Sequence, residues 1–158
     1  MASDEQTAVL EGATHSGHMG RNLNEAARYA LMHAGLWLFK EADPFYRSLG
    51  LTGVQYNVLR VLEVAEEALP QQEIARRVLA SRANVTSLLD QLEKKGLVER
   101  RSCEDRRVKR IHLTTKARDL LERTYDQIFE INARLMRNLT ESEKHKLLAL
   151  IRKLDQTV

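Results

Sequence analysis

The segment from residue 78 to residue 113 constrains the fold more than any other part of the chain, because three structural signals follow one another in it. Ser81 can cap a helix in which apolar residues recur at intervals of three and four. Gly96 can end this helix in a left-handed conformation. Two extended segments, at about 97–102 and 107–113, then predict a β-hairpin.

The predicted helix has two contrasting faces. Its apolar stripe consists of Val85, Leu88, Leu89 and Leu92, at the spacing of a buried helix face. Arginine and asparagine can hydrogen-bond to purine edges, and serine and glutamine can bond to bases or phosphates, so the other face suits a DNA major groove. An ordinary solvated surface is the alternative interpretation. The candidate DNA contacts on this helix are Ser81, Arg82, Asn84, Thr86, Ser87 and Gln91.

Positive charge is concentrated in the same region. The segment 69–113 holds 11 Lys and Arg against 6 Asp and Glu, whereas the rest of the chain holds 14 against 16. Residues 100–110 alone carry six cations and two anions. Clustered cations favour binding to a polyanion, and an extended arginine fits a minor groove that is too narrow for a helix. The candidate DNA contacts on this hairpin, or wing, are Arg101, Asp105, Arg106, Arg107 and Lys109.

The remaining chain is predicted to be mainly helical. Residues 1–20 lack a sustained period, so we expect a disordered tail. A long helix is predicted over 22–47, with a break or kink at Pro44. A second helix, capped by Thr52, should run to about residue 64. Its predicted buried face is Val54, Val58, Leu59 and Leu62.

Further helices are predicted before and after the helix that Ser81 caps, which we call the reading helix because its polar face is the candidate surface for reading DNA bases. A short one begins at Pro70 and ends near residue 79 or 80. An apolar stripe predicts one long helix from about 114 to 138. Thr140 and Glu143 have the spacing of a capping box, which predicts a last helix after them.

Composition excludes several classes of protein. No stretch of about 20 apolar residues or secretory signal is present, and Cys103 is the only cysteine, so we expect a soluble cytoplasmic protein without disulfides. His15 and His18 are three residues apart but lack further ligands, so no metal site is predicted. No phosphate loop, His-Glu-x-x-His pattern or nucleophile elbow occurs, and we expect neither an enzyme nor a cofactor.

Several of these motifs together resemble the MarR family of transcriptional regulators. The resemblance lies in the run LEKKGLVER at 92–100, in Asp105 with Arg107, and in Leu113-Thr114. The run GLTGVQYNVLRVL at 50–62 resembles the family's second helix, so the similarity covers about residues 22–158. Ala117 departs from a common glycine, outside the DNA-facing surface.

The resemblance implies a mainly α fold with a small β-hairpin wing: a winged helix-turn-helix flanked by N- and C-terminal dimerisation helices. It divides the chain into a tail (1–20), an N-terminal dimerisation helix (21–50), a DNA-binding region (51–113) and C-terminal dimerisation helices (114–158). It also implies a homodimeric repressor on a palindromic operator of double-stranded DNA. Arg107 would enter the minor groove, oriented by Asp105; a mere surface ion pair is the alternative.

Regulation could take more than one form. The resemblance implies a small phenolic or anionic effector, for which His33, Trp37, Tyr46, Tyr56 and Arg60 are candidate pocket residues. No spacing motif identifies them as a pocket, and each is more typical of a core or surface position than of a ligand contact. Oxidation of Cys103, beside several arginines, is an alternative trigger. A winged-helix module that contacts proteins and binds DNA weakly is the other alternative function.

Overall fold

The computed structural model describes residues 22–65, 67–78, 80–102 and 109–154, which fall into two compact units. The first described unit is residues 22–42, most of helix α2 (Leu23–Ser48). Among the described helices, none is long and apolar enough to span a bilayer. After the end of α2, the second unit contains, in chain order, α3 (Gly53–Val64), β1 (Leu69–Pro70), α4 (Gln71–Arg77), α5 (Arg82–Lys94), β2 (Val98–Ser102), β3 (Lys109–Leu113), α6 (Thr115–Arg123), α7 (Tyr125–Leu135) and α8 (Glu141–Leu154).

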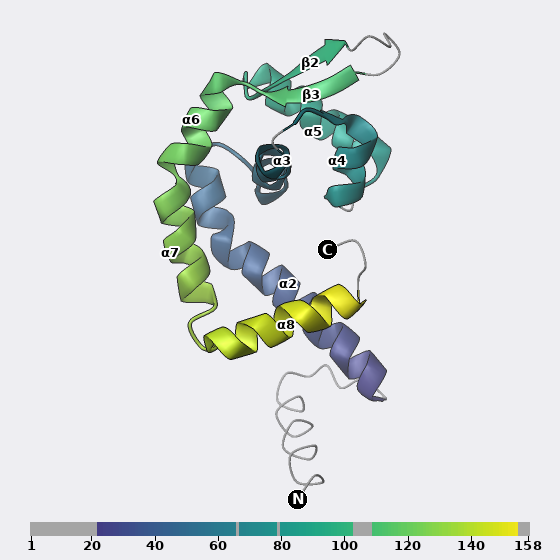
Figure 1. Ribbon diagram of the computed structural model, residues 1–158, viewed down its shortest axis with the longest axis vertical. Coiled ribbons are helices and arrows are strands. Elements are labelled where there is room, and N and C mark those ends of the chain that lie inside the picture. The colour runs from purple at the N-terminus through teal and green to yellow at the C-terminus, as the bar shows by residue number, and fades with distance from the viewer. Residues whose placement is uncertain (1–21, 66, 79, 103–108, 155–158) are drawn as a thin grey trace, which may run out of the picture. The chain divides into compact units, whose positions relative to one another are not determined.

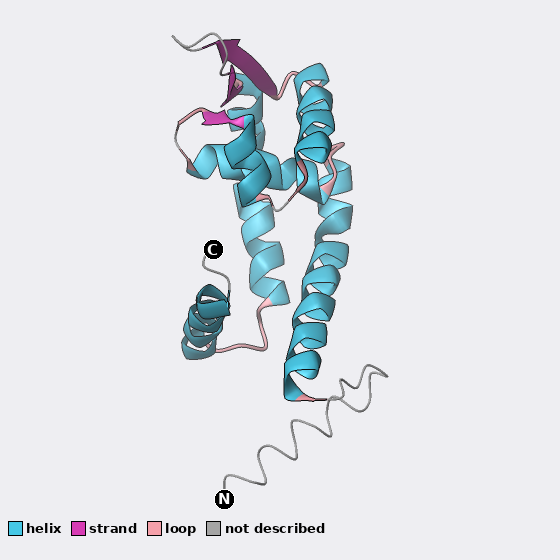
Figure 2. Cartoon of the chain, turned by 90° about the vertical axis from the view of Figure 1, so that its right-hand side faces the viewer, coloured by secondary structure: helices cyan, strands magenta, loops and turns pink. Residues whose placement is uncertain are grey.

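The second unit is built around a winged helix-turn-helix. Helices α3, α4 and α5 pack together, and the hairpin of β2 and β3 lies beside α5 (Figure 1). The strands lie toward one end of this unit (Figure 2). The prediction of a mainly helical chain with a small wing is therefore confirmed.

Local signals set the bounds of these elements. Gly50 and Gly96 adopt φ of 68° and 69°, a left-handed conformation that glycine takes without steric cost. Thr52, Ser81 and Thr114 each accept a hydrogen bond from the backbone N–H three residues later and so cap α3, α5 and α6. The helix starts and stops expected in the reading segment are confirmed.

A single apolar core holds the winged helix together. Val85, Leu89 and Leu92 of α5 are fully buried, as are Leu59 of α3 and Ile74 of α4. Burying each such side chain contributes roughly 1.5–3 kcal/mol before the entropic cost of folding. This core fixes which face of α5 remains at the surface.

The wing contains one strand more than predicted. The short strand β1 pairs antiparallel with β3, with Leu69 opposite Ile111, so the sheet has the order β1-β3-β2 rather than two strands. Strand β1 has only two residues, and one is Pro70, which lacks the N–H of a regular strand. Such a strand exists only because β3 is available to pair with it.

Two helix predictions were wrong about continuity. Helix α2 continues through Pro44 to Ser48, where a break was expected; the missing proline N–H removes a single bond close to the end of the helix, and Phe45 is buried in the core. The expected single helix over 114–138 is divided into α6 and α7 at Thr124. The Thr124 hydroxyl donates to the Leu120 carbonyl at 2.8 Å, a back-bond that accompanies bending of helices.

The buried face of α3 also differs from the prediction. Val54 is 38% exposed, and Gln55 takes its place beneath the core at 2% exposure. The stripe that contains Val58, Leu59 and Leu62 extends back by three residues to Gln55, and Val54 lies outside it. A buried polar side chain thus occupies the start of the stripe.

Helices α7 and α8 contribute no buried residue. Thr140 and Glu143 form the predicted capping box at the start of α8, with the Thr140 N–H donating to the Glu143 carboxylate at 2.8 Å. Large apolar side chains on both helices are exposed, among them Phe129 at 63% and Leu148 at 48%. In both views α8 lies away from the winged helix (Figures 1 and 2).

Candidate nucleic-acid interface

Helix α5 presents a polar face whose direction is fixed by its buried face. Asn84, Ser87 and Gln91 are exposed on the side away from Val85 and Leu89. Ser81 caps the helix through the Asn84 N–H at 3.2 Å. The side chain of Arg82 lies outside the described part of the chain. The structure therefore brings three of the predicted reading residues to one surface.

Thr86, another predicted reading residue, has a partner within the protein. The Gln71 amide of α4 donates to its hydroxyl at 2.5 Å. This bond ties the first helix of the helix-turn-helix to the second. Thr86 thus helps to place α5 in addition to standing exposed on it.

A chain of hydrogen bonds runs from buried Gln55 to the polar face of α5. The Gln55 amide nitrogen donates to the Gln91 side-chain oxygen at 2.7 Å, and the Gln91 nitrogen donates to the Ser87 hydroxyl at 3.3 Å. On its other side the Gln55 oxygen accepts from the Thr52 N–H at 3.2 Å and from the Lys95 ammonium at 3.4 Å. The outward-facing polar groups are therefore connected to the interior of the domain.

The wing is joined to α5 by a second set of contacts. Arg100 of β2 forms ion pairs with both Asp90 and Glu93 of α5. On β3, the Arg110 guanidinium donates to the Ala68 carbonyl at 2.8 Å. Both arginines thus serve to position the wing, and neither was singled out as a candidate from the sequence.

The described base of the wing presents two of the predicted wing contacts. Arg101 and Lys109 are both exposed, on paired strands in which Ser102 lies opposite Lys109. Arg101 also pairs with Glu99. The remaining predicted wing residues Asp105, Arg106 and Arg107, together with Cys103, lie outside the described residues.

Three of the candidate effector residues belong to the second unit and two to the first. Tyr46 and Tyr56 lie together with Phe45, at ring-centre distances of 5.1 to 5.6 Å. Burial raises the pKa of both phenols. Arg60 pairs with Glu63. In the first unit, His33 and Trp37 are exposed on α2.

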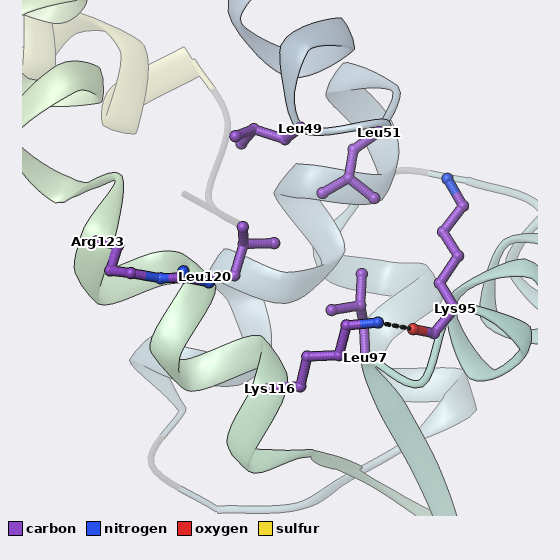
Figure 3. A pocket seen from close by; sticks show the side chains of 7 residues that line it. All are labelled: Leu49, Leu51, Lys95, Leu97, Lys116, Leu120 and Arg123. Carbon is purple, nitrogen blue, oxygen red and sulfur yellow. Dashed lines mark hydrogen bonds between the residues drawn. The ribbon is translucent and has the colours of Figure 1, made fainter.

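A cavity that the sequence analysis did not predict lies between the start of α3 and helix α6. Its volume is about 210 Å³ (Figure 3). Among the described residues, its three cations form no ion pair; the Lys116 ammonium donates to the Lys95 carbonyl at 2.8 Å. Helical spacing alone could not reveal a site assembled from segments so far apart in sequence. The lining consists of Leu49, Leu51, Leu97, Leu120, Lys95, Lys116 and Arg123.

Gln55 is the other functional candidate that was missed. Its signal was present in the sequence, because Thr52 and Gln55 have the spacing of a capping box. The contact of Gln55 with Gln91, however, joins residues 36 positions apart and depends on the packing of α3 against α5. That part follows from the fold only.

Comparison with known proteins places this interface in context. A model of the MarR family matches residues 49–108, which includes α3, α4, α5 and the wing. Among solved structures, MepR from S. aureus in complex with DNA is 26% identical, over 83% of this chain and 97% of its own, with a TM-score of 0.72. A MarR family transcriptional regulator from Streptomyces coelicolor, also in complex with DNA, is 24% identical, over 86% and 88%, with a TM-score of 0.74.

A mutant MarR from E. coli, complexed with operator DNA, is similar over 80% of this chain and 91% of its own, at 23% identity and a TM-score of 0.73. The match of the family model to residues 49–108 agrees with the winged helix-turn-helix that the second unit contains. It also agrees with the expectation of a regulator rather than an enzyme. Residues 49–108 of this chain thus match the MarR family of winged helix-turn-helix transcriptional regulators, and the chain has the fold of solved members of that family.

Proposed function

We propose that this protein is a homodimeric repressor that binds a palindromic operator through α5 and the wing. The observation that carries this proposal is the exposed face of α5, where Asn84, Ser87 and Gln91 stand beside a basic hairpin. Amide and hydroxyl groups of this kind discriminate between base edges, and the cations of the wing supply affinity for phosphates. MepR and the regulators from E. coli and S. coelicolor were each solved with DNA, which supports the same use of the fold here.

The wing would contribute a minor-groove contact. Arg107 is the residue that we assign to this contact, with Asp105 as its orienting carboxylate and Arg106 as a phosphate contact. Arg101 and Lys109, at the base of the hairpin, are exposed and stand where they can add phosphate contacts. A narrow minor groove concentrates negative potential, which favours an inserted guanidinium.

Dimerisation would use the residues outside the DNA-binding region, that is, 21–50 and 114–158. The apolar side chains of α7 and α8 support this assignment, because Phe129 and Leu148 are largely exposed in one chain. Contiguous exposed apolar surface commonly marks an interface. A two-fold dimer would place two reading helices about one DNA turn apart, as a palindrome requires.

Operator binding tests this function directly. Salt-titrated binding of the full chain should be compared between the DNA that flanks its own gene and a random duplex of equal length. A sequence-specific regulator shows a specificity ratio of roughly 10³ or more. Arg107→Ala should lose most operator affinity and still sediment as a dimer. Equal affinity for both duplexes would contradict the proposal and favour the protein-interaction module.

The cavity beside α6 is a better candidate for an effector site than the five residues named from the sequence. Four leucines and the three cations Lys95, Lys116 and Arg123 suit an amphipathic carboxylate or phenolate. Lys95 also contacts Gln55, so an anion that attracted Lys95 would disturb the hydrogen bonds leading to α5. This link supports a mechanism in which binding of the effector, rather than oxidation of Cys103, releases the DNA.

Benzoate is a suitable probe of this cavity. We expect it to perturb NMR signals of Lys95 and Leu120 and to weaken operator binding. Lys116→Ala and Arg123→Ala should weaken the effect of benzoate, whereas Lys144→Ala, on α8, should not. Release of DNA by oxidant alone, abolished by Cys103→Ser, would instead favour the redox mechanism.

A further inference from the structure

Buried Gln55 has an amide orientation that its partners determine. The Thr52 N–H and the Lys95 ammonium can only donate, so the atom facing them, at 3.2 and 3.4 Å, must be the Gln55 oxygen. The Gln55 nitrogen therefore faces Gln91, to which it donates at 2.7 Å. At 2% exposure, this amide has no space to exchange its partners with water.

The orientation of Gln55 dictates that of Gln91. Because the Gln55 nitrogen is a donor, Gln91 must turn its oxygen inward and its nitrogen toward the surface of α5. The Gln91 nitrogen donates to the Ser87 hydroxyl at 3.3 Å, which engages one of the two lone pairs of the Ser87 oxygen. The second N–H of Gln91 and the proton of Ser87 are then the donors available to a ligand.

We propose that Gln55 is a specificity-determining residue, which orients Gln91 as a hydrogen-bond donor toward an acceptor-rich base edge in the operator. This inference rests on the proposed function, in which α5 enters the major groove. Guanine presents two acceptors there, N7 and O6, whereas cytosine presents an amino donor. Gln91 so oriented favours guanine and rejects cytosine at one base pair of each half-site. Gln55 itself touches no DNA.

Gln55→Glu tests the inference because it reverses the polarity of the buried partner. A carboxylate at position 55 still accepts from Thr52, still completes a capping box and pairs with Lys95. Toward Gln91, however, it offers an acceptor, so Gln91 must turn its nitrogen inward and its oxygen outward. Ser87 then donates its proton to that oxygen and keeps both of its lone pairs free. The same surface of α5 changes from donors to acceptors.

Selection from randomised duplexes with the full chain gives the readout. We expect the wild type to enrich a symmetric motif with guanine at one position of each half-site. Gln55→Glu should move the preference at that position toward cytosine or adenine, by about tenfold relative to wild type, and leave the other positions unchanged. Gln91→Ala should remove the preference there. The double variant should behave as Gln91→Ala does.

Other results of this selection would overturn either the inference alone or the proposed function as well. An unchanged motif for Gln55→Glu, with an altered one for Gln91→Ala, would show that Gln55 does not orient Gln91. An unchanged motif for Gln91→Ala would show that Gln91 reads no base; both results overturn the inference and leave the proposed function standing. A wild type that enriches no motif would overturn the proposed function, and the inference with it.

A variant at the surface tests whether Gln91 reads this base pair, even if the buried carboxylate of Gln55→Glu prevents folding. Gln91→Glu still accepts from the Gln55 nitrogen and turns its second carboxylate oxygen outward. Since Gln91 is exposed, this change leaves the core intact. We expect the same movement of preference toward cytosine or adenine. A folded Gln91→Glu protein that retains guanine would contradict the inference.

Discussion

The Arg100 guanidinium of β2 lies 2.5 Å from the Asp90 carboxylate of α5 and also pairs with Glu93, so one side chain fastens the wing to the reading helix. The Arg100 side chain is only 19% exposed. Arg100→Met should lower the free energy of unfolding by about 1 kcal/mol, at the upper end for surface ion pairs, because two acids share this partly buried arginine. Urea denaturation measures the change.

Arg101 provides a matched control for Arg100. It also lies on β2, but it pairs with a single acid, Glu99, and its side chain is 63% exposed. Arg101→Met should change the free energy of unfolding by less than about 0.5 kcal/mol. Equal losses for the two variants would show that Arg100 does not fasten the wing specifically.

The parts of the fold differ in how far the sequence could predict them. Gly50, Gly96 and Ser81 act through their own backbone or through a hydrogen bond three residues away, so local patterns were sufficient. Strand β1 exists through its pairing with β3, some 40 positions later, and no local pattern marks it. The division between α6 and α7 at Thr124 coincides with the hydrogen bond from the Thr124 hydroxyl to the Leu120 carbonyl. The spacing of apolar residues does not indicate such a bond.

The same distinction applies to the candidate site. The exposed face of α5 follows from helical spacing once Val85, Leu89 and Leu92 are taken as buried. The partners of that face do not, because Gln55 and Lys95 come from other parts of the chain. The sequence thus predicts which side chains are exposed on α5, and the fold determines how they are oriented.

Tyr56 offers a test of an unsatisfied buried group. Its hydroxyl makes no hydrogen bond to the described residues, and burial raises its pKa. Tyr56→Phe should therefore leave the free energy of unfolding unchanged or increase it. Tyr56→Ala should lower it by about 3 kcal/mol, because the ring packs against Phe45 and Tyr46. A loss above about 1 kcal/mol for Tyr56→Phe would reveal a bond to the hydroxyl.

Glu73 should give the fold an acid-sensitive contribution. Hydrogen bonds from Arg76, at 2.8 and 3.0 Å, and from Arg77, at 2.7 Å, lower the pKa of this carboxyl from 4.5 to about 2. Because the pKa in the folded state is depressed, the contribution is complete above pH 4.5 and is lost as the pH falls toward 2. The free energies of urea unfolding of wild type and Glu73→Gln should differ most near neutral pH and become equal as the pH approaches 2. A difference that did not vary across this range would contradict the assignment.

The exposed apolar side of α8 makes dimerisation directly testable. Leu148→Glu would place an unpaired carboxylate in the proposed interface, which costs several kcal/mol and should weaken the dimer at least about a hundredfold. Sedimentation should then show the mass of the single 18.1 kDa chain. Because each half-site would be bound alone, operator affinity should fall as well. Lys146→Ala, an exposed polar position on the same helix, serves as the control and should remain dimeric. A Leu148→Glu protein that sediments at twice the chain mass would exclude this face from the interface.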